Sequence, residues 1–484
     1  MATTQAMSLM DASFFLMETP VTPLHIAAGS LFRLPRNGDG DYVRRLHEHW
    51  RRFPVNRAPF NFRLGKEGLS TLRPEWDVLD SVDLDQHLFR IALPRPGGDE
   101  ELEQLLARLH ERPLDRSRPM WEIYLIEGLS DRRFATYTKI HHSLADGTTA
   151  VRLFSSQYTP DADDRSTRPV WNLRRPAGAQ PSQAAQPARS LLQGLPLTPG
   201  AARQVLGRAV HGARNVLTLV SDLKDAPLSA RAPETIFGRP VTARRKIGHA
   251  VFAFDRVKGV SKALGSTIND VALVVCGGAL RRYLQGIDAL PDESVVCAMP
   301  ISLNKEGNVK GGNTVASVPV ALGTDIDDVR QRFEVIRDSM QDIKARLAKM
   351  SVGAIGLTTT VSQVPVLFER VTGRWPLPHR INNVILSNVP GPRERLYMHG
   401  AEYQGSIPLP MILNGIGLNI TIVSFHDRIW FSYTSCPDIA PHIDRLGPLI
   451  TRSFEELERV MARRKRPAKT GRRARGRKKA ARAR

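Results

Sequence analysis

Residues 141–147 of this chain read His-His-Ser-Leu-Ala-Asp-Gly, so two adjacent histidines stand shortly before an Asp-Gly pair. The run before them, residues 133–140, is rich in β-branched and aromatic residues and predicts a strand. Neighbouring side chains of a strand point to opposite faces, so we expect His141 and His142 to have different tasks. Histidine titrates near neutral pH and is the side chain most often used to take a proton from a hydroxyl. An isolated histidine pair usually occurs by chance at the surface or in the core. The full pattern His-His-x-x-x-Asp-Gly is rare by chance and favours a functional site.

Two residues at the end of this segment end the predicted strand. Asp146 and Gly147 break it, and residues 148–157 predict the start of a helix. Asp146 is suited to cap that helix through its carboxylate, and Gly147 permits a tight turn. Both residues therefore have a local structural explanation beside any functional one.

Length and composition limit the class of protein. A chain of 484 residues with 42% hydrophobic content is expected to form two globular domains. The three cysteines, Cys276, Cys297 and Cys436, are scattered and odd in number, which favours a reducing cytosol and offers no zinc spacing. We see no secretory signal peptide, in which a basic segment precedes an apolar one, and no apolar run long enough to span a bilayer. We therefore expect a protein that is soluble or lies on a membrane surface.

The patterns divide the chain into four predicted segments. Residues 1–165 alternate helical and strand patterns and predict an α/β domain. Residues 166–245 are rich in Pro, Ala, Gln, Ser and Arg and predict a linker. A basic amphipathic helix within this linker either lies on a membrane or packs across the domain junction. Residues 246–462 predict a second α/β domain, and residues 463–484, with thirteen Lys or Arg and no acidic residue, predict a disordered tail.

The second half carries its own local signals. Thr267 and Asp270 have the spacing of a capping box before an apolar run, which predicts a helix start. Residues 329–347 carry an apolar stripe at helical spacing that is typical of core packing. Residues 418–425 and 428–434 predict a hairpin around His426 and Asp427.

Several motifs together resemble a known family. Pro119-Met120-Trp121 precedes the histidine motif, Asn269-Asp270 lies in the second half, and Ser387-Asn388 begins the run that ends in Pro-Gly-Pro at residues 390–392. With the opening residues 7–26, these motifs resemble the bacterial wax ester synthase/diacylglycerol acyltransferase family, which is related to chloramphenicol acetyltransferase and to the condensation domains of peptide synthetases. The resemblance extends to about residue 461. Where the family often has Pro-Leu-Trp this chain has Met120, a nearly volume-conserving change.

The resemblance implies an α/β fold of two chloramphenicol acetyltransferase-like domains with mixed sheets, joined by a partly helical linker, and an active site in a channel between them. It implies that His142 is the general base and that His141 supports the loop or the base. Asp146 and Gly147 complete the motif, with Asp146 in a structural role. Beside the channel it places Asn269, Asp270, Trp121, Ser387 and Asn388. Each of these also has a plainer explanation, because Asp270 starts a helix, Ser387 and Asn388 precede a turn, and tryptophan is more often a core residue.

The chemistry that fits these residues is ester formation from a thioester and an alcohol. A base takes the hydroxyl proton while hydrogen-bond donors stabilise the oxyanion. The chain has no Gly-x-Ser-x-Gly elbow and no His-Glu-x-x-His, and none of its cysteines lies in a recognisable nucleophile motif, so a direct transfer without metal is expected. There is no Walker or dinucleotide loop, so no cofactor is expected and acyl-CoA is a substrate.

The resemblance thus predicts an O-acyltransferase that moves a long-chain fatty acyl group from acyl-CoA to diacylglycerol, to a long-chain fatty alcohol, or to both. The alternatives are a condensation-type enzyme that uses carrier-bound donors and a non-catalytic protein that binds lipid or polyanions. The basic tail could attract anionic lipid, bind nucleic acid or only aid solubility. Because the other motifs suggest lipid chemistry, we favour a cytoplasmic protein held at the inner face of the plasma membrane or at lipid inclusions.

Overall fold

The structure is a computed structural model. It describes residues 3–7, 9–65, 75–145, 147–173, 231–302, 315–349, 369 and 380–464. The predicted linker helix, Asp146 and the tail beyond residue 464 lie outside the described residues.

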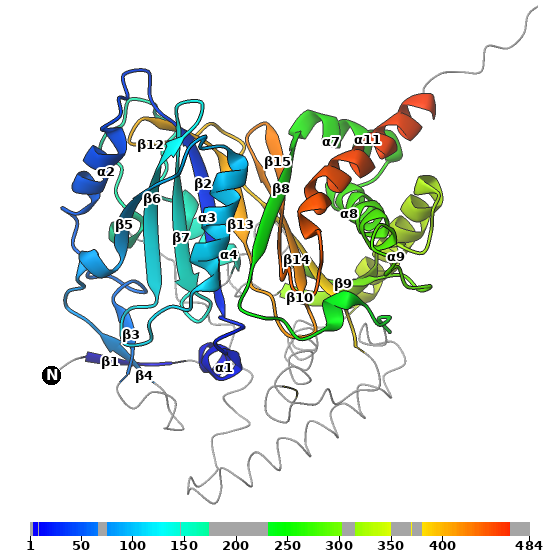
Figure 1. Ribbon diagram of the computed structural model, residues 1–484, viewed down its shortest axis with the longest axis horizontal. Coiled ribbons are helices and arrows are strands. Elements are labelled where there is room, and N and C mark those ends of the chain that lie inside the picture. Colours follow the sequence, from blue (N-terminus) through cyan, green and yellow to red (C-terminus); the bar gives the residue numbers. More distant parts are fainter. Residues whose placement is uncertain are drawn as a thin grey trace, which may run out of the picture.

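The first half is built on a six-stranded mixed sheet with the order β12-β13-β2-β7-β6-β5. Only β5 and β6 pair in parallel, and the neighbours of β7 are both antiparallel. A small three-stranded sheet, β1-β4-β3, lies beside it (Figure 1). The elements of this half are β1 (Thr3–Ala6), α1 (Leu9–Met17), β2 (His25–Arg33), α2 (Tyr42–Trp50), β3 (Phe62–Leu64), β4 (Glu75–Val78), β5 (Leu88–Ala92), α3 (Asp99–Glu111), β6 (Trp121–Leu129), β7 (Arg133–His141) and α4 (Gly147–Ser155).

The second half is built on a second six-stranded mixed sheet with the order β10-β9-β11-β14-β15-β8. Its helices gather on the side away from the first half, with α8 in the middle (Figure 1). Gly277 of α8 allows this close packing, because a Cβ there would stand 2.0 Å from the Leu322 carbonyl oxygen. The elements are β8 (Lys246–Ala253), α7 (Phe254–Leu264), α8 (Ile268–Gln285), β9 (Val296–Ser302), β10 (Val315–Ala321), α9 (Val329–Lys349), β11 (Val384–Pro390), β12 (Tyr397–Met398), β13 (Ala401–Leu409), β14 (Leu418–Phe425), β15 (Arg428–Ser435) and α11 (Leu446–Arg464).

The two halves exchange structure. Strands β12 and β13 belong to the second half in sequence but complete the first sheet, where β13 pairs with β2. Helix α3 of the first half packs on β8 of the second, and the His249 Nδ1 and Glu103 Oε1 atoms lie 2.6 Å apart across this seam. A buried cluster at the seam combines Leu102 and Leu106 of α3 with Trp430 of β15. The junction is therefore a hydrophobic core of its own and not a loose contact.

Most local expectations agree with these elements. The capping box forms, with the Asp270 N–H donating to Thr267 Oγ1 and the Thr267 N–H donating to the Asp270 carboxylate. The predicted hairpin is β14 and β15, which pair antiparallel along their whole length. Among the described helices, none on its own is long and apolar enough to cross a membrane; α7 and α8 pass the same test only as a pair that is bent by 100°.

Candidate active site

His141 lies at the end of β7 and is completely buried. It stands opposite His25 of β2 in the sheet. Its ring stacks on Phe15 of α1 with the centroids 4.4 Å apart. Its Nδ1 lies 2.6 Å from the Ser143 hydroxyl oxygen, and its Nε2 lies 3.5 Å from the Glu18 carboxylate. All of these partners are inside the protein, so His141 is committed to internal contacts.

The hydrogen bonds assign the tautomer of His141. The backbone N–H of Ser143, which can only donate, points at Nδ1 from 3.3 Å. Nδ1 is therefore an acceptor, and the ring proton lies on Nε2, facing the Glu18 carboxylate. At 3.5 Å that contact is an electrostatic one rather than a well-formed hydrogen bond. Because the His141 ring is completely buried, with its nitrogens facing Ser143 and Glu18, it is poorly placed to meet a substrate hydroxyl.

Glu18 is a buried carboxylate with several partners. It follows α1, and its Oε1 accepts a hydrogen bond of 2.9 Å from the Leu24 N–H. Its Oε2 accepts two bonds from the Arg116 guanidinium, at 2.7 and 3.1 Å. Burial raises the pKa of Glu18, but the contacts with His141, Arg116 and the Leu24 N–H outweigh it and lower the pKa to about 2. Glu18 is thus a permanent negative charge behind the histidine pair.

His142 has different surroundings. It lies in the turn after β7, one residue beyond the strand end, and it is only half-buried. Its backbone N–H donates to the Leu24 carbonyl at 2.9 Å. Its ring stacks on Phe14 with centroids 4.3 Å apart and planes inclined by 30°. The two histidines therefore have different surroundings, and His142 is the more accessible of them; because His142 lies in the turn beyond β7, strand alternation is not the cause.

The motif residues after the histidines give a mixed result. Asp146 lies outside the described residues. Gly147 is the first residue of α4, as predicted. An added Cβ at Gly147 would meet nothing within 4 Å among the described residues, and the expected tight turn at Asp146 stays a prediction.

The residues expected from the second half lie together on β11 and at the start of α8. The Asn388 side-chain amide donates to the Asn269 side-chain carbonyl, which joins β11 to the first turn of α8. Asp270 is buried and occupied by the capping box. Ser387 Oγ lies 3.0 Å from Thr421 Oγ1 on the neighbouring strand. Both asparagines are half-buried, so of this group they are the better candidates for contact with a substrate.

Trp121 lies in the core of the first half. It is completely buried, its Nε1 donates to the Phe60 carbonyl at 2.7 Å, and its ring stacks on His87 at 4.4 Å and on Trp171 at 5.6 Å. These contacts support the plainer explanation of the tryptophan as a packing residue.

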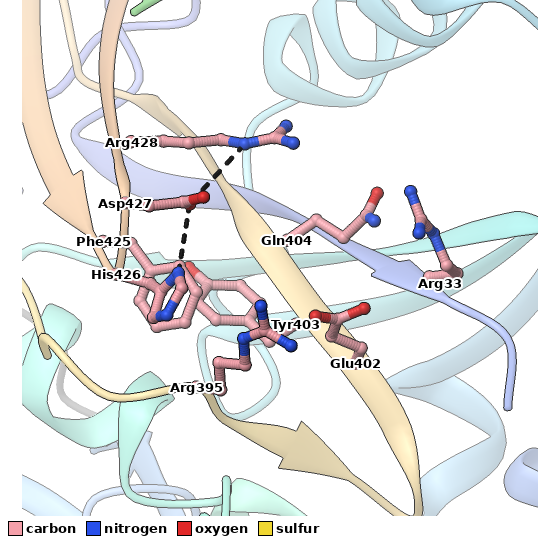
Figure 2. Close-up of a pocket in the computed structure, with 9 residues that line it drawn as sticks. All are labelled: Arg33, Arg395, Glu402, Tyr403, Gln404, Phe425, His426, Asp427 and Arg428. Carbon is pink, nitrogen blue, oxygen red and sulfur yellow. Dashed lines mark ion pairs between the residues drawn. The ribbon is translucent and has the colours of Figure 1, made fainter. Parts of the chain in front are cut away.

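A polar pocket of about 250 Å³ lies elsewhere. It is lined by charged residues from β2, β13 and the β14–β15 turn, together with Arg395 (Figure 2). Arg33, at its edge, pairs with Arg133 at the start of β7, whereas the histidine pair ends that strand. Along a strand this separation is roughly 25 Å. The pocket shares no residue with the histidine pair, and its cations stand beside Glu402 and Asp427, so it is separate from the candidate site at the histidines.

Within the described residues, no three side chains of His, Cys, Asp or Glu lie close enough to hold a metal ion. Sequence reasoning missed two residues of the site, Phe14 and Glu18. Both lie on or just after α1, more than 120 positions before the histidines that they contact, and no local pattern connects them. The only available signal was the resemblance of the opening residues to the family.

Comparisons with known proteins agree with this geometry. The first condensation domain of the CDA synthetase matches the structure with a TM-score of 0.55 and 15% identity, over 95% of this chain and 96% of that one. The two mixed sheets thus have the condensation-domain and chloramphenicol acetyltransferase-like fold. Residues 7–272 match the wax ester synthase/diacylglycerol acyltransferase catalytic domain, and residues 311–458 match the C-terminal domain of the same family. The chain belongs to this wax ester synthase/diacylglycerol acyltransferase family.

Individual relatives cover nearly the whole chain. A probable diacylglycerol O-acyltransferase of Mycobacterium tuberculosis is 34% identical over 453 residues, which are 93% of this chain and 98% of that protein. The wax ester synthase/diacylglycerol acyltransferase of Marinobacter aquaeolei VT8 matches the structure with a TM-score of 0.76 and 29% identity. That match covers 95% of this chain and all of the other.

The contact between Asn388 and Asn269 makes a testable prediction. Because the two side chains pair with each other, Asn388→Ala and Asn269→Ala should be non-additive, with a coupling of about 1 kcal/mol in the free energy of unfolding. Urea denaturation of both single variants and the double variant measures this coupling. Additive effects would show that the two amides act separately.

Proposed function

We propose that this chain is an acyl-CoA-dependent O-acyltransferase that moves a long-chain fatty acyl group to diacylglycerol, to a long-chain fatty alcohol, or to both. The products would be triacylglycerol and wax ester. Family membership supports acyl transfer. The observation that carries the proposal is the difference in burial within the histidine pair, because His141 is completely buried, with its ring nitrogens facing Ser143 and Glu18, while His142 is only half-buried.

The proposed reaction needs one base and one transfer step. The His142 imidazole takes the proton of the acceptor hydroxyl as its oxygen attacks the thioester carbonyl carbon. The C–O bond forms, the C–S bond breaks, and the departing thiolate of CoA receives the proton from the imidazolium. The acyl group passes directly from sulfur to oxygen.

The cysteines support a direct transfer over a covalent acyl-enzyme. All three are buried in the second half. Burial raises the pKa of the Cys297 thiol to about 12, and it raises that of Cys276 as well. A buried thiol with a raised pKa is a poor nucleophile, because the thiolate is the reactive form.

The experiment uses the full-length purified protein with palmitoyl-CoA and either dipalmitoylglycerol or hexadecanol. We expect free thiol to be released only when donor and acceptor are both present, with ester formed in equal amount. Palmitoyl groups carried on an acyl carrier protein are the comparison donor. Turnover with the carrier-bound donor alone would favour the condensation-type alternative, and no turnover with any donor would favour a binding protein.

We also propose that the basic residues 463–484 hold the protein at anionic lipid, at the inner face of the plasma membrane or on lipid inclusions. Each basic residue near such a surface contributes about 1 kcal/mol of attraction. Deleting residues 463–484 should abolish binding to vesicles that contain an anionic phospholipid. Turnover on detergent-dispersed substrate should survive. Loss of nucleic-acid binding without any change in vesicle binding would contradict this assignment.

A further inference from the structure

Helix α1 places two consecutive phenylalanines against the two consecutive histidines. Phe15 stacks on His141 and Phe14 stacks on His142, with centroid separations of 4.4 and 4.3 Å. The helix lies at the end of the first sheet where β7 finishes (Figure 1). One turn of helix thus covers a face of both imidazoles, although only one of them is the proposed base.

The two phenylalanines are not equivalent in packing. Phe15 is 2% exposed and also contacts the Trp76 ring and the Arg116 guanidinium, which makes it a core residue. Phe14 is half-buried, so burial of apolar surface explains less of its position. Its described ring contact is with the His142 imidazole.

A stacked phenyl ring has a chemical consequence for a base. The face of an aromatic ring carries partial negative charge, and it attracts a cation placed over it. In the proposed reaction His142 becomes an imidazolium when it takes the hydroxyl proton. The stack therefore stabilises the charged form, which resembles the transition state, more than the neutral ground state, and such differential stabilisation raises kcat and leaves binding alone.

We propose that Phe14 is a positioning residue for His142, which fixes the plane of the imidazole and stabilises the imidazolium formed during acyl transfer. The inference rests on the proposed function, in which His142 is the base. It does not extend to Phe15, because the His141 ring is completely buried, faces Ser143 and Glu18 and is not the proposed base.

The test compares three variants in the palmitoyl-CoA assay. Phe14→Leu keeps an apolar side chain but removes the aromatic face, and we expect kcat to fall about 3- to 30-fold with the KM for acyl-CoA unchanged. Phe14→Tyr restores an aromatic face and should recover most of that loss. Phe15→Leu is the matched control at the adjacent position, where we expect a larger loss of unfolding free energy and a smaller loss of kcat.

Two kinetic outcomes overturn the inference. One is a Phe14→Leu variant with wild-type kcat, and the other is an equal loss of kcat in Phe14→Leu and Phe15→Leu. A separate measurement needs no activity: proton NMR of the histidine rings, with the His142 signals assigned by their absence in His142→Ala. The stack predicts ring-current shifts of these signals that disappear in Phe14→Leu but remain in Phe14→Tyr, and signals that do not move also overturn it. An active His142→Ala variant would instead refute the proposed base, while the NMR result would still decide whether the stack exists.

Discussion

Replacing His142 with alanine is expected to leave a folded protein whose kcat is lower by about two to four orders of magnitude, the usual contribution of a general base. The fold should survive because the side chain is only half-buried and lies outside the hydrophobic clusters. The hydrogen bond to the Leu24 carbonyl comes from the His142 backbone, which alanine retains. Thiol release from palmitoyl-CoA measures the loss, and circular dichroism confirms the fold.

The matched control is the same substitution one residue earlier. His141→Ala removes a completely buried ring that contacts Glu18 and Ser143, so it should lower the free energy of unfolding by about 2–4 kcal/mol. Any loss of activity in His141→Ala should therefore accompany a loss of folded protein. In His142→Ala, activity should fall while the protein stays folded. Near-full activity of His142→Ala would remove it as the base and leave the motif with a structural role.

Sequence patterns were sufficient where the signal is local. The strand before the histidines, the capping box of Thr267 and Asp270 and the hairpin of β14 and β15 all depend on residues a few positions apart, and all are present. Different surroundings for His141 and His142 were also expected and are present, although the expected reason, strand alternation, does not apply because His142 lies in the turn beyond β7. Their roles in catalysis remain predictions.

Patterns were insufficient where partners are distant in the sequence. Strand β13 carries no local sign that it will pair with β2, roughly 370 residues earlier, instead of with its own half. The choice is decided by tertiary packing at the seam, where Gly405 has a φ of +141° and a Cβ would stand 2.2 Å from the Trp430 indole nitrogen. Phe14 and Glu18 were missed for the same reason. The contact of the Asp270 carboxylate, in contrast, was predictable because its partner Thr267 is close in the sequence.

Glu18 is the clearest example of a site residue that only the fold reveals. Its carboxylate accepts from the Leu24 N–H, and the carbonyl of Leu24 accepts from the His142 N–H, so one residue connects the buried charge to the proposed base. The side chain of Glu18 is 5% exposed, and that of Arg116 is 41% exposed. The pKa of Glu18 falls from its ordinary value of 4.5 to about 2 on folding, which corresponds to about 3 kcal/mol of stability at neutral pH.

Glu18→Gln should therefore lower the free energy of unfolding at pH 7 by about 3 kcal/mol, as measured by urea denaturation. Because the pKa of Glu18 is lower in the folded state, its contribution is complete above about pH 4.5 and is lost as the pH falls toward 2. The difference between wild type and variant should accordingly narrow below pH 4.5. The matched control is Glu48→Gln, which breaks an exposed pair with Arg44 and should cost less than about 1 kcal/mol at any pH. Equal effects of the two substitutions at pH 7 would mean that the buried Glu18 carboxylate contributes no more to stability than an exposed one and that the turn carrying His142 is held by other contacts.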